Sequence, residues 1–122
     1  MATALIVEDS LTDRELLTHY LQQSGITVTS AQSSEEALQM LKTTPPDLVF
    51  LDVVLPGQSG FEFCRDLKTT ESTQNIPVVI CSTKGTEADK LWGSMLGADA
   101  YLTKPVDQQQ LTKTVEQLMR IR

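Results

Sequence analysis

Three carboxylates and one lysine stand where they would do chemistry together, each just past a short apolar run. Glu8 and Asp9 follow the first run, and Asp52 follows the third. Lys104 follows the last run. Three acids that lie close together repel one another, and a hard divalent ion with oxygen ligands, Mg²⁺ above all, removes that repulsion. An aspartate beside a metal ion and a lysine can be the nucleophile that accepts a phosphoryl group. The residue types therefore predict metal-dependent phosphoryl chemistry at Asp52.

These side chains meet only if the apolar runs are strands that end at one edge of a sheet. Five runs alternate with helical patterns, and the expected strands are Thr3–Val7, Ile26–Ser30, Leu48–Leu51, Val78–Cys81 and Ala100–Leu102. Strands that are apolar on both faces and alternate with helices are typical of a parallel sheet covered on both sides. We therefore predict an α/β fold with a single doubly wound five-stranded parallel sheet, in the flavodoxin-like order 2-1-3-4-5, and five helices. The ligand site of such a sheet lies beyond the carboxyl ends of its first and third strands.

The helical segments begin with polar residues that cap helices. Residues 10–13, 33–36 and 86–89 each have a serine or threonine followed three residues later by an acid, which predicts three capping boxes. The fourth helical segment carries an apolar stripe at helical spacing, formed by Ala88, Leu91, Trp92 and Met95. We expect this stripe to pack against the sheet, although the large area of the single tryptophan keeps a role in partner binding open.

The composition favours one ordinary globular domain. A chain of 122 residues has room for a single domain, expected over residues 1–122. No stretch approaches the roughly 20 apolar residues of a membrane span, and the N-terminus has no basic flank, so we expect neither membrane insertion nor a signal peptide. A net charge of −6 disfavours nucleic acid as a partner. Cys64 and Cys81, with no secretory signal, indicate reduced thiols and a cytoplasmic location.

The residues around the strand ends resemble a known family. The segments that carry the resemblance are Val7-Glu8-Asp9, Leu51-Asp52-Val53-Val54-Leu55-Pro56-Gly57 with Gly60, Pro77-Val78-Val79-Ile80-Cys81-Ser82 and Gly97-Ala98-Asp99-Ala100-Tyr101-Leu102-Thr103-Lys104-Pro105. In this order they resemble the receiver domain of response regulators in two-component signalling, of the stand-alone kind seen in the chemotaxis response regulator. The resemblance extends from Leu5 to Met119, essentially the whole chain.

The resemblance implies a phosphoacceptor and a metal site. It makes Asp52 the phosphoacceptor, beside an Mg²⁺ ion held by the side chains of Glu8, Asp9 and Asp52 and by the backbone carbonyl of Val54. Glu8 stands where the family more often has aspartate, and one extra methylene still reaches a metal-bound water. Val54 has no side-chain group to orient a water molecule for hydrolysis, so we expect slow self-dephosphorylation.

The resemblance also implies a phosphate-binding and switching set at the ends of the last two strands. It makes Ser82 the switch hydroxyl, Lys104 a phosphate ligand and Tyr101 the switch aromatic residue. Thr83 belongs to the same phosphate-binding region, at a place where the family usually has a smaller residue, and it narrows the approach of the phosphoryl group. The peptide bond before Pro105 is expected to be cis by the same resemblance.

A receiver domain implies protein partners rather than a free substrate. The resemblance implies that a histidine kinase or a histidine phosphotransfer protein donates the phosphoryl group, and that an unknown downstream protein reads the result. The expected output face is made by the fourth helix, fifth strand and fifth helix, and its candidate contacts are Leu91, Trp92 and Met95. On this interpretation the protein is not an enzyme but a phosphoacceptor that assists its own phosphorylation and dephosphorylation. We expect no fused output domain, and the Trp92-Gly93 pair is similar to stand-alone receivers of type IV pilus motility systems.

Three other functions are weighed against this one. A phosphatase or phosphotransferase of the haloacid-dehalogenase kind also uses a nucleophilic aspartate. It requires a second acid two residues after that aspartate as general acid/base, and this chain has Val54 there. A flavin or dinucleotide carrier would need a phosphate loop rich in glycine, serine or threonine after the first strand, where this chain has Glu8 and Asp9. A degenerate receiver that acts only as a scaffold is disfavoured because the five site positions of the family are all filled, by Glu8, Asp9, Asp52, Ser82 and Lys104.

Overall fold

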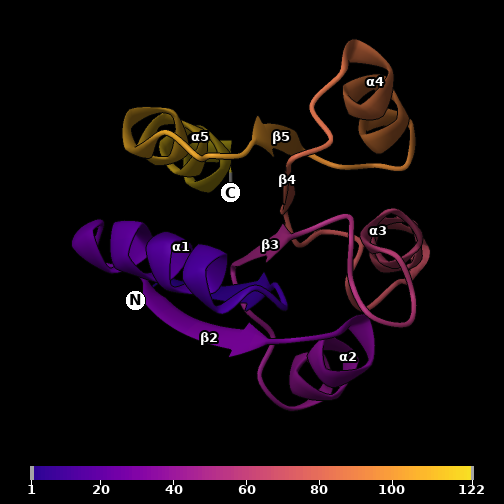
Figure 1. Ribbon diagram of the computed structural model, residues 1–122. Helices are drawn as coiled ribbons and strands as arrows, with labels where there is room; N and C mark the ends of the chain where they lie inside the picture. The colour runs from indigo at the N-terminus through magenta and orange to yellow at the C-terminus, as the bar shows by residue number, and fades with distance from the viewer. Residues whose placement is uncertain (1, 122) are drawn as a thin grey trace.

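Five parallel strands form one sheet in the computed structural model, which describes residues 2–121 (Figure 1). The strands are β1 (Thr3–Val7), β2 (Thr27–Ala31), β3 (Leu48–Leu51), β4 (Val78–Ser82) and β5 (Ala100–Thr103). Their order is β2-β1-β3-β4-β5, and every neighbouring pair is parallel. The predicted α/β fold and strand order are therefore confirmed. β2 begins and ends one residue later than expected, and β4 and β5 each extend one residue further.

Within the described residues, five helices cover the two faces of the sheet, namely α1 (Leu11–Gln23), α2 (Ser34–Thr43), α3 (Gly60–Thr69), α4 (Glu87–Met95) and α5 (Gln108–Ile121). Successive strand residues point to opposite faces of the sheet. Because the residues of the buried strands are almost all apolar, both faces of these strands are apolar. On one face Ile6 and Phe50 pack with Leu111 of α5, and α1 lies beside α5 (Figure 1). On the other face Leu51 packs with Phe63 of α3, next to α2. None of the helices in residues 2–121 has the length and apolar character needed to cross a bilayer.

Helix α4 meets the sheet through a glycine. Gly93 is its buried residue, and a Cβ atom there would lie 3.1 Å from both Ile80 Cδ1 and the ring of Tyr101. The apolar stripe lies on the opposite side, with exposed fractions of 63%, 49% and 68% for Leu91, Trp92 and Met95. The expectation that this stripe packs against the sheet is therefore wrong. Helical spacing predicts that the stripe shares one face, but the missing side chain at residue 93 decides which face approaches the strands.

The helices begin at the predicted capping residues, but only one of the three predicted capping boxes is complete. In α4 the Thr86 side chain accepts from the Asp89 N–H at 3.1 Å, and the Asp89 carboxylate accepts from the Thr86 N–H at 3.2 Å. In α1 Ser10 Oγ accepts from the Asp13 N–H at 3.4 Å, and α2 likewise has only the serine half. The Ser10 N–H donates instead to Glu8 Oε2 at 3.1 Å. The acidic half of the first predicted box is therefore wrong, because Glu8 takes the backbone group that Asp13 would have accepted from.

Candidate functional site

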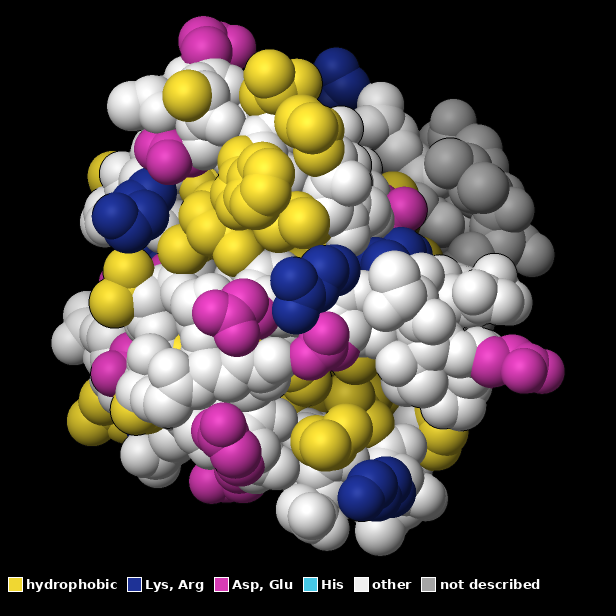
Figure 2. All heavy atoms as spheres, turned by 90° about the vertical axis from the view of Figure 1, so that its right-hand side faces the viewer, with side chains coloured by type: hydrophobic (Ala, Val, Ile, Leu, Met, Phe, Trp, Pro, Cys, Tyr) yellow, Lys and Arg dark blue, Asp and Glu magenta, His cyan; other side chains and the backbone are white. Residues whose placement is uncertain are grey.

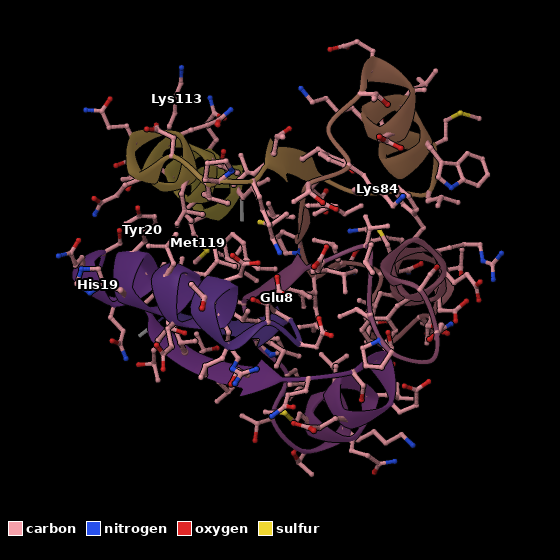
Figure 3. All side chains as sticks on the ribbon, viewed as in Figure 1. Glu8, His19, Tyr20, Lys84, Lys113 and Met119 are labelled. Atoms are coloured by element: carbon pink, nitrogen blue, oxygen red, sulfur yellow. The ribbon has the colours of Figure 1, made fainter. Side chains whose placement is uncertain are left out.

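The carboxyl ends of β1 and β3 bring the three predicted acids together. One carboxylate oxygen from each of Glu8, Asp9 and Asp52 lies within 4.8 Å of the other two. The Asp52 N–H donates to the Val7 carbonyl at 3.1 Å, which holds the end of β3 beside the end of β1. Glu8 lies near the middle of the view in Figure 3, where side chains from several elements converge. Glu8 and Asp52 are buried, while Asp9 is exposed, so the cluster has one open side.

Lys104 lies among these acids. Its backbone N–H donates to the Ser82 carbonyl at 2.9 Å, which fixes the residue beside the end of β4, and the Lys104–Pro105 peptide bond is cis. Its side chain is 9% exposed. The ammonium donates to three carboxylates, at 2.9 Å from Asp13 and 3.1 Å from Asp52, with a third bond to Glu8. The lysine, which directly follows β5, thus connects this end of the sheet to the acids that follow β1 and β3 and to Asp13 of α1.

The site carries more negative than positive charge. Burial raises the pKa of Glu8 above its ordinary value, while bonds from Lys104 and from the Ser10 N–H oppose that rise. Burial lowers the pKa of Lys104, but its hydrogen bonds with the carboxylates outweigh burial and raise the pKa above its ordinary value. Four carboxylates face one ammonium, which leaves a formal charge of −3 when all five groups are ionised. A divalent cation that prefers oxygen ligands suits these four carboxylates, because it would offset the repulsion among them that a single lysine does not neutralise.

Asp13 belongs to this site, although it was not among the residues predicted from the sequence. The predicted residues directly follow strands, whereas Asp13 lies in the first turn of α1. A usable signal was present in the sequence. Because α1 starts three residues after Glu8, at the edge where the strands end, an acid one turn into this helix lies near the site.

The two predicted switch residues meet the loop between β4 and α4. Ser82 is fully buried, and its Oγ accepts from the Lys84 N–H at 3.2 Å. The Tyr101 hydroxyl donates to the Lys84 carbonyl, and Lys84 lies between α3 and α4 in Figure 3. Tyr101 is half-buried, and Thr83 is exposed on the same loop. The backbone of Lys84 is therefore hydrogen-bonded to both predicted switch residues, Ser82 and Tyr101.

The loop after Asp52 is packed closely against α3. The Val54 N–H donates to Asp52 Oδ1 at 3.3 Å, and the Val54 side chain is exposed. The Gly60 N–H donates to the Val53 carbonyl at 2.8 Å. A Cβ atom at Gly60 would lie 1.8 Å from the Asp52 carbonyl oxygen, so only glycine fits there without a shift of the backbone. The start of α3 thus packs directly against the backbone of Asp52 and Val53.

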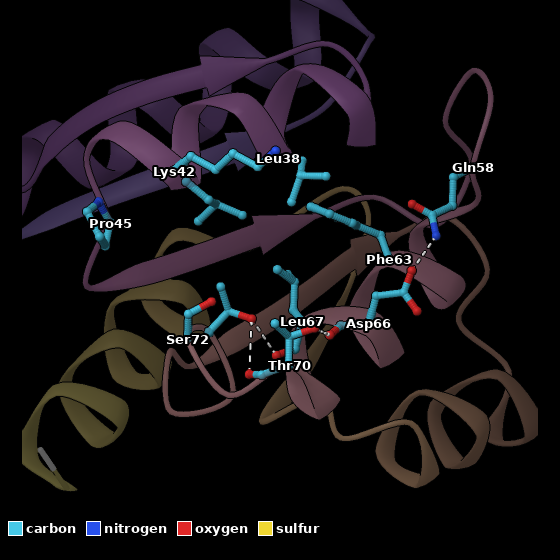
Figure 4. A pocket seen from close by; sticks show the side chains of 11 residues that line it. Leu38, Lys42, Pro45, Gln58, Phe63, Asp66, Leu67, Thr70 and Ser72 are labelled. Atoms are coloured by element: carbon cyan, nitrogen blue, oxygen red, sulfur yellow. Dashed lines mark hydrogen bonds between the residues drawn. The ribbon is translucent and has the colours of Figure 1, made fainter.

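Other surface features lie apart from the acids. The exposed side chains of α4 form an apolar patch in the upper part of Figure 2, and its large members are Leu91, Trp92 and Met95. A pocket of about 510 Å³ lies between α2 and α3 (Figure 4). Its walls include Leu38 and Phe63, and at one end Gln58 Nε2 donates to Asp66 Oδ2 at 2.7 Å. None of the predicted site residues lines this pocket.

The family model for the response regulator receiver domain matches residues 4–116. This chain belongs to that family. The predicted resemblance is confirmed, and the receiver domain is a phosphorylatable signalling domain of two-component systems. Receiver domains of response regulators accept their phosphoryl group from histidine kinases or phosphotransfer proteins.

Known relatives match the receiver over almost its whole length. Protein PilH of Pseudomonas aeruginosa is 41% identical over 119 residues, which cover 98% of each chain. The phosphate regulon transcriptional regulatory protein PhoB of Escherichia coli is 38% identical over 116 residues. That match covers 95% of this chain and 51% of PhoB, so the receiver spans about half the length of that relative. The solved chemotaxis response regulator CheY4 of Vibrio cholerae is 30% identical, with a TM-score of 0.88 over 97% of this chain and 98% of that one.

Proposed function

We propose that Asp52 is the residue of this receiver that accepts the phosphoryl group. The observation that carries the proposal is the Lys104 ammonium 3.1 Å from Asp52 Oδ2, beside two further acids within 4.8 Å. A carboxylate oxygen of Asp52 attacks the phosphorus of a phosphohistidine, so a P–O bond forms as the P–N bond breaks. The electron pair of the broken bond stays on the imidazole, which then takes up a proton. Lys104 offsets the charge on the phosphoryl oxygens.

The proposal includes an Mg²⁺ ion. The residues that would hold it are Glu8, Asp9 and Asp52, with the backbone carbonyl of Val54. Oxygen donors of this kind are those that Mg²⁺ prefers, and the excess negative charge of the cluster favours a cation. When bound, the ion supplies positive charge that stabilises the oxygens of the transferring group.

Phosphorylation changes what a partner meets. The phosphoryl group offers Ser82 a strong acceptor, and a bond to it draws the hydroxyl away from Lys84. Tyr101, which is bonded to the same Lys84, then changes its position, and Thr83 borders the phosphoryl group. The output face proposed for a downstream protein is α4, β5 and α5, with Leu91, Trp92 and Met95 as contacts. This mechanism makes the receiver a phosphoacceptor rather than an enzyme acting on a free substrate.

The setting of the receiver is also part of the proposal. A kinase that feeds it uses ATP, which places the transfer in the cytoplasm. The chain has 10 lysines and arginines against 16 acids, a net charge of −6, so it has no excess of basic residues to neutralise the phosphates of a nucleic acid. A motility system, either chemotaxis or type IV pilus, is the proposed pathway class. The resemblance to the stand-alone chemotaxis response regulator supports the first, and the Trp92-Gly93 pair, which resembles receivers of type IV pilus systems, supports the second. Residues 1–122 act as one domain, and Met1 and Arg122 lie outside the described residues.

The proposal is tested by phosphorylation with acetyl phosphate, with and without Mg²⁺, followed by intact mass. The wild type is expected to gain a single base-labile phosphoryl group only with Mg²⁺. Asp52→Asn is expected to gain none, because an amide is not a nucleophile of comparable strength. Asp66→Asn, which removes an exposed carboxylate that belongs neither to the acid cluster nor to the partners of Lys104, serves as the matched control. Uptake by Asp52→Asn at the wild-type level would show that the acceptor is another residue.

A further inference from the structure

We propose that Asp13 is a positioning residue that competes with the phosphoryl group for the Lys104 ammonium and so favours the unphosphorylated receiver. The proposal rests on the proposed roles of Asp52 and Lys104. It concerns how strongly the site holds an added anion, which the acceptor assignment leaves open.

The geometry of α1 directs the Asp13 carboxylate toward the lysine. Asp13 is the third residue of α1, where an acid ordinarily turns back to accept from the N–H of the capping residue. Here the Ser10 N–H donates to Glu8 instead, at 3.1 Å. The Asp13 carboxylate reaches Lys104 Nζ at 2.9 Å, a distance typical of a charge-assisted hydrogen bond.

The lysine has no spare donor for a phosphoryl oxygen. An ammonium group has three N–H donors. Lys104 contacts three carboxylates, those of Glu8, Asp13 and Asp52. A phosphoryl oxygen therefore gains a bond from Lys104 only as one of these carboxylates gives up its own.

A bound cation would relieve two of these contacts but not the third. Glu8 and Asp52 belong to the group of carboxylates placed to share a metal ion. A cation held there would take over part of their interaction with the ammonium. Asp13 is not in that group, so it retains its hold on Lys104. A phosphoryl group then brings about two negative charges close to the Asp13 carboxylate, which repels them. Both effects weaken the binding of an anion at Asp52.

The experiment compares anion binding with cation binding in purified variants. The anion probe is beryllofluoride, a phosphoryl mimic, titrated at saturating Mg²⁺ and followed by ¹⁹F NMR of the bound species. The cation probe is Mg²⁺ alone, titrated by calorimetry. Asp13→Asn keeps the shape of the side chain and removes its charge. Glu15→Gln makes the same change of charge on the same helix, at an exposed residue for which no contact with Lys104 is found in residues 2–121.

Asp13→Asn is expected to bind beryllofluoride about two- to fivefold more tightly than the wild type, the range for one partly exposed charge pair. It is expected to bind Mg²⁺ more weakly, because a nearby negative charge is gone. Glu15→Gln is expected to change either affinity by much less, and Asp13→Glu to return both toward the wild type. A merely structural role for Asp13 would weaken both ligands together, so the opposite signs identify an effect of the Asp13 charge on the Lys104 site.

Two results would overturn the proposal while leaving the phosphoacceptor in place. Unchanged beryllofluoride affinity in Asp13→Asn would show that Asp13 does not influence the anion. Weaker beryllofluoride binding would show that Asp13 helps Lys104 reach the phosphoryl group instead of withholding it. Failure of the wild type to bind beryllofluoride with Mg²⁺ would be a different result, since it would overturn the proposed function and this proposal with it.

Discussion

Replacing Gly60 by alanine is expected to destabilise the receiver more than the same replacement at Gly25 or Gly93. A Cβ atom at residue 60 would lie 1.8 Å from the Asp52 carbonyl oxygen and 2.7 Å from both Asp52 C and Val53 Cα. Ordinary contact begins near 3.4 Å, so the backbone of α3 and that of the β3–α3 loop must separate. The contacted atoms belong to the backbone and cannot rotate aside. Overpacking of flexible side chains costs about 1–3 kcal/mol, so we expect a loss of at least about 3 kcal/mol in the free energy of unfolding.

The two other glycines provide matched controls for Gly60→Ala in urea unfolding followed by circular dichroism. Gly25 has a φ of +80° and nothing within 4 Å of an added Cβ, so Gly25→Ala tests backbone strain alone, at about 1–2 kcal/mol. Gly93→Ala would place a Cβ 3.1 Å from the tip of Ile80 and the ring of Tyr101. Those side chains can move by a few tenths of an ångström, and alanine favours the helix by about 1 kcal/mol, so the net change is expected to be small.

The expected order of loss is therefore Gly60→Ala, then Gly25→Ala, then Gly93→Ala. Displacement of the Asp52 backbone also predicts weaker beryllofluoride binding in Gly60→Ala than in Gly25→Ala, measured at a temperature where both variants are folded. If Gly60→Ala unfolds at the same urea concentration as Gly25→Ala, the close approach of α3 to Asp52 does not limit stability, and the reasoning is refuted.

Three further predictions concern charge. Without Mg²⁺, Asp9→Asn is expected to be more stable than the wild type by about 1 kcal/mol, because one charge leaves the acid cluster, and to gain less from added Mg²⁺; equal gains in calorimetric melting would contradict a metal site. Asp99 Oδ2 accepts from the Val78 N–H at 2.8 Å and from Lys68 Nζ at 3.0 Å. Asp99→Ala is therefore expected to cost about 1–3 kcal/mol in urea unfolding, whereas Lys68→Met, which leaves the Val78 bond intact, costs less. Because burial raises the pKa of Glu8, the folded state holds this proton at a pH where the unfolded chain has released it. The wild type is therefore expected to lose stability relative to Glu8→Gln as the pH rises above about 4.5. A difference in urea midpoint between the two proteins that stays the same from about pH 4.5 to pH 7 would contradict this.

The strand ends explain why most of the site could be predicted from the sequence. Glu8, Asp52 and Lys104 follow directly after strands β1, β3 and β5, and the carboxyl ends of parallel strands meet at one edge. Once the alternation of strands and helices is recognised, few strand orders remain, and the observed order brings these residues together. Local patterns were enough because each residue's place depends on its strand rather than on a particular side-chain contact.

The features that the sequence did not predict depend on contacts between distant elements. The Asp13 carboxylate could accept a hydrogen bond from the capping N–H of Ser10 or from Lys104. It accepts from Lys104 because the Glu8 side chain already accepts from the Ser10 N–H. The outward direction of the Trp92 stripe depends on Gly93, whose lack of a side chain lets α4 approach Tyr101. Spacing along the chain identifies which residues share a face of a helix, but it does not say which face a neighbouring element covers.

The way α4 meets the sheet has a consequence for its motion. A helix that places large side chains in the core must lose their contacts before its backbone opens, as α3 would lose those of Phe63 and Leu67. Between Glu87 and Met95, α4 buries only Gly93, so local opening of this helix exposes little apolar surface. Its amide hydrogens are therefore expected to exchange with solvent faster than those of α3. A change at Tyr101 thus acts on α4, a helix that we expect to open more readily than α3.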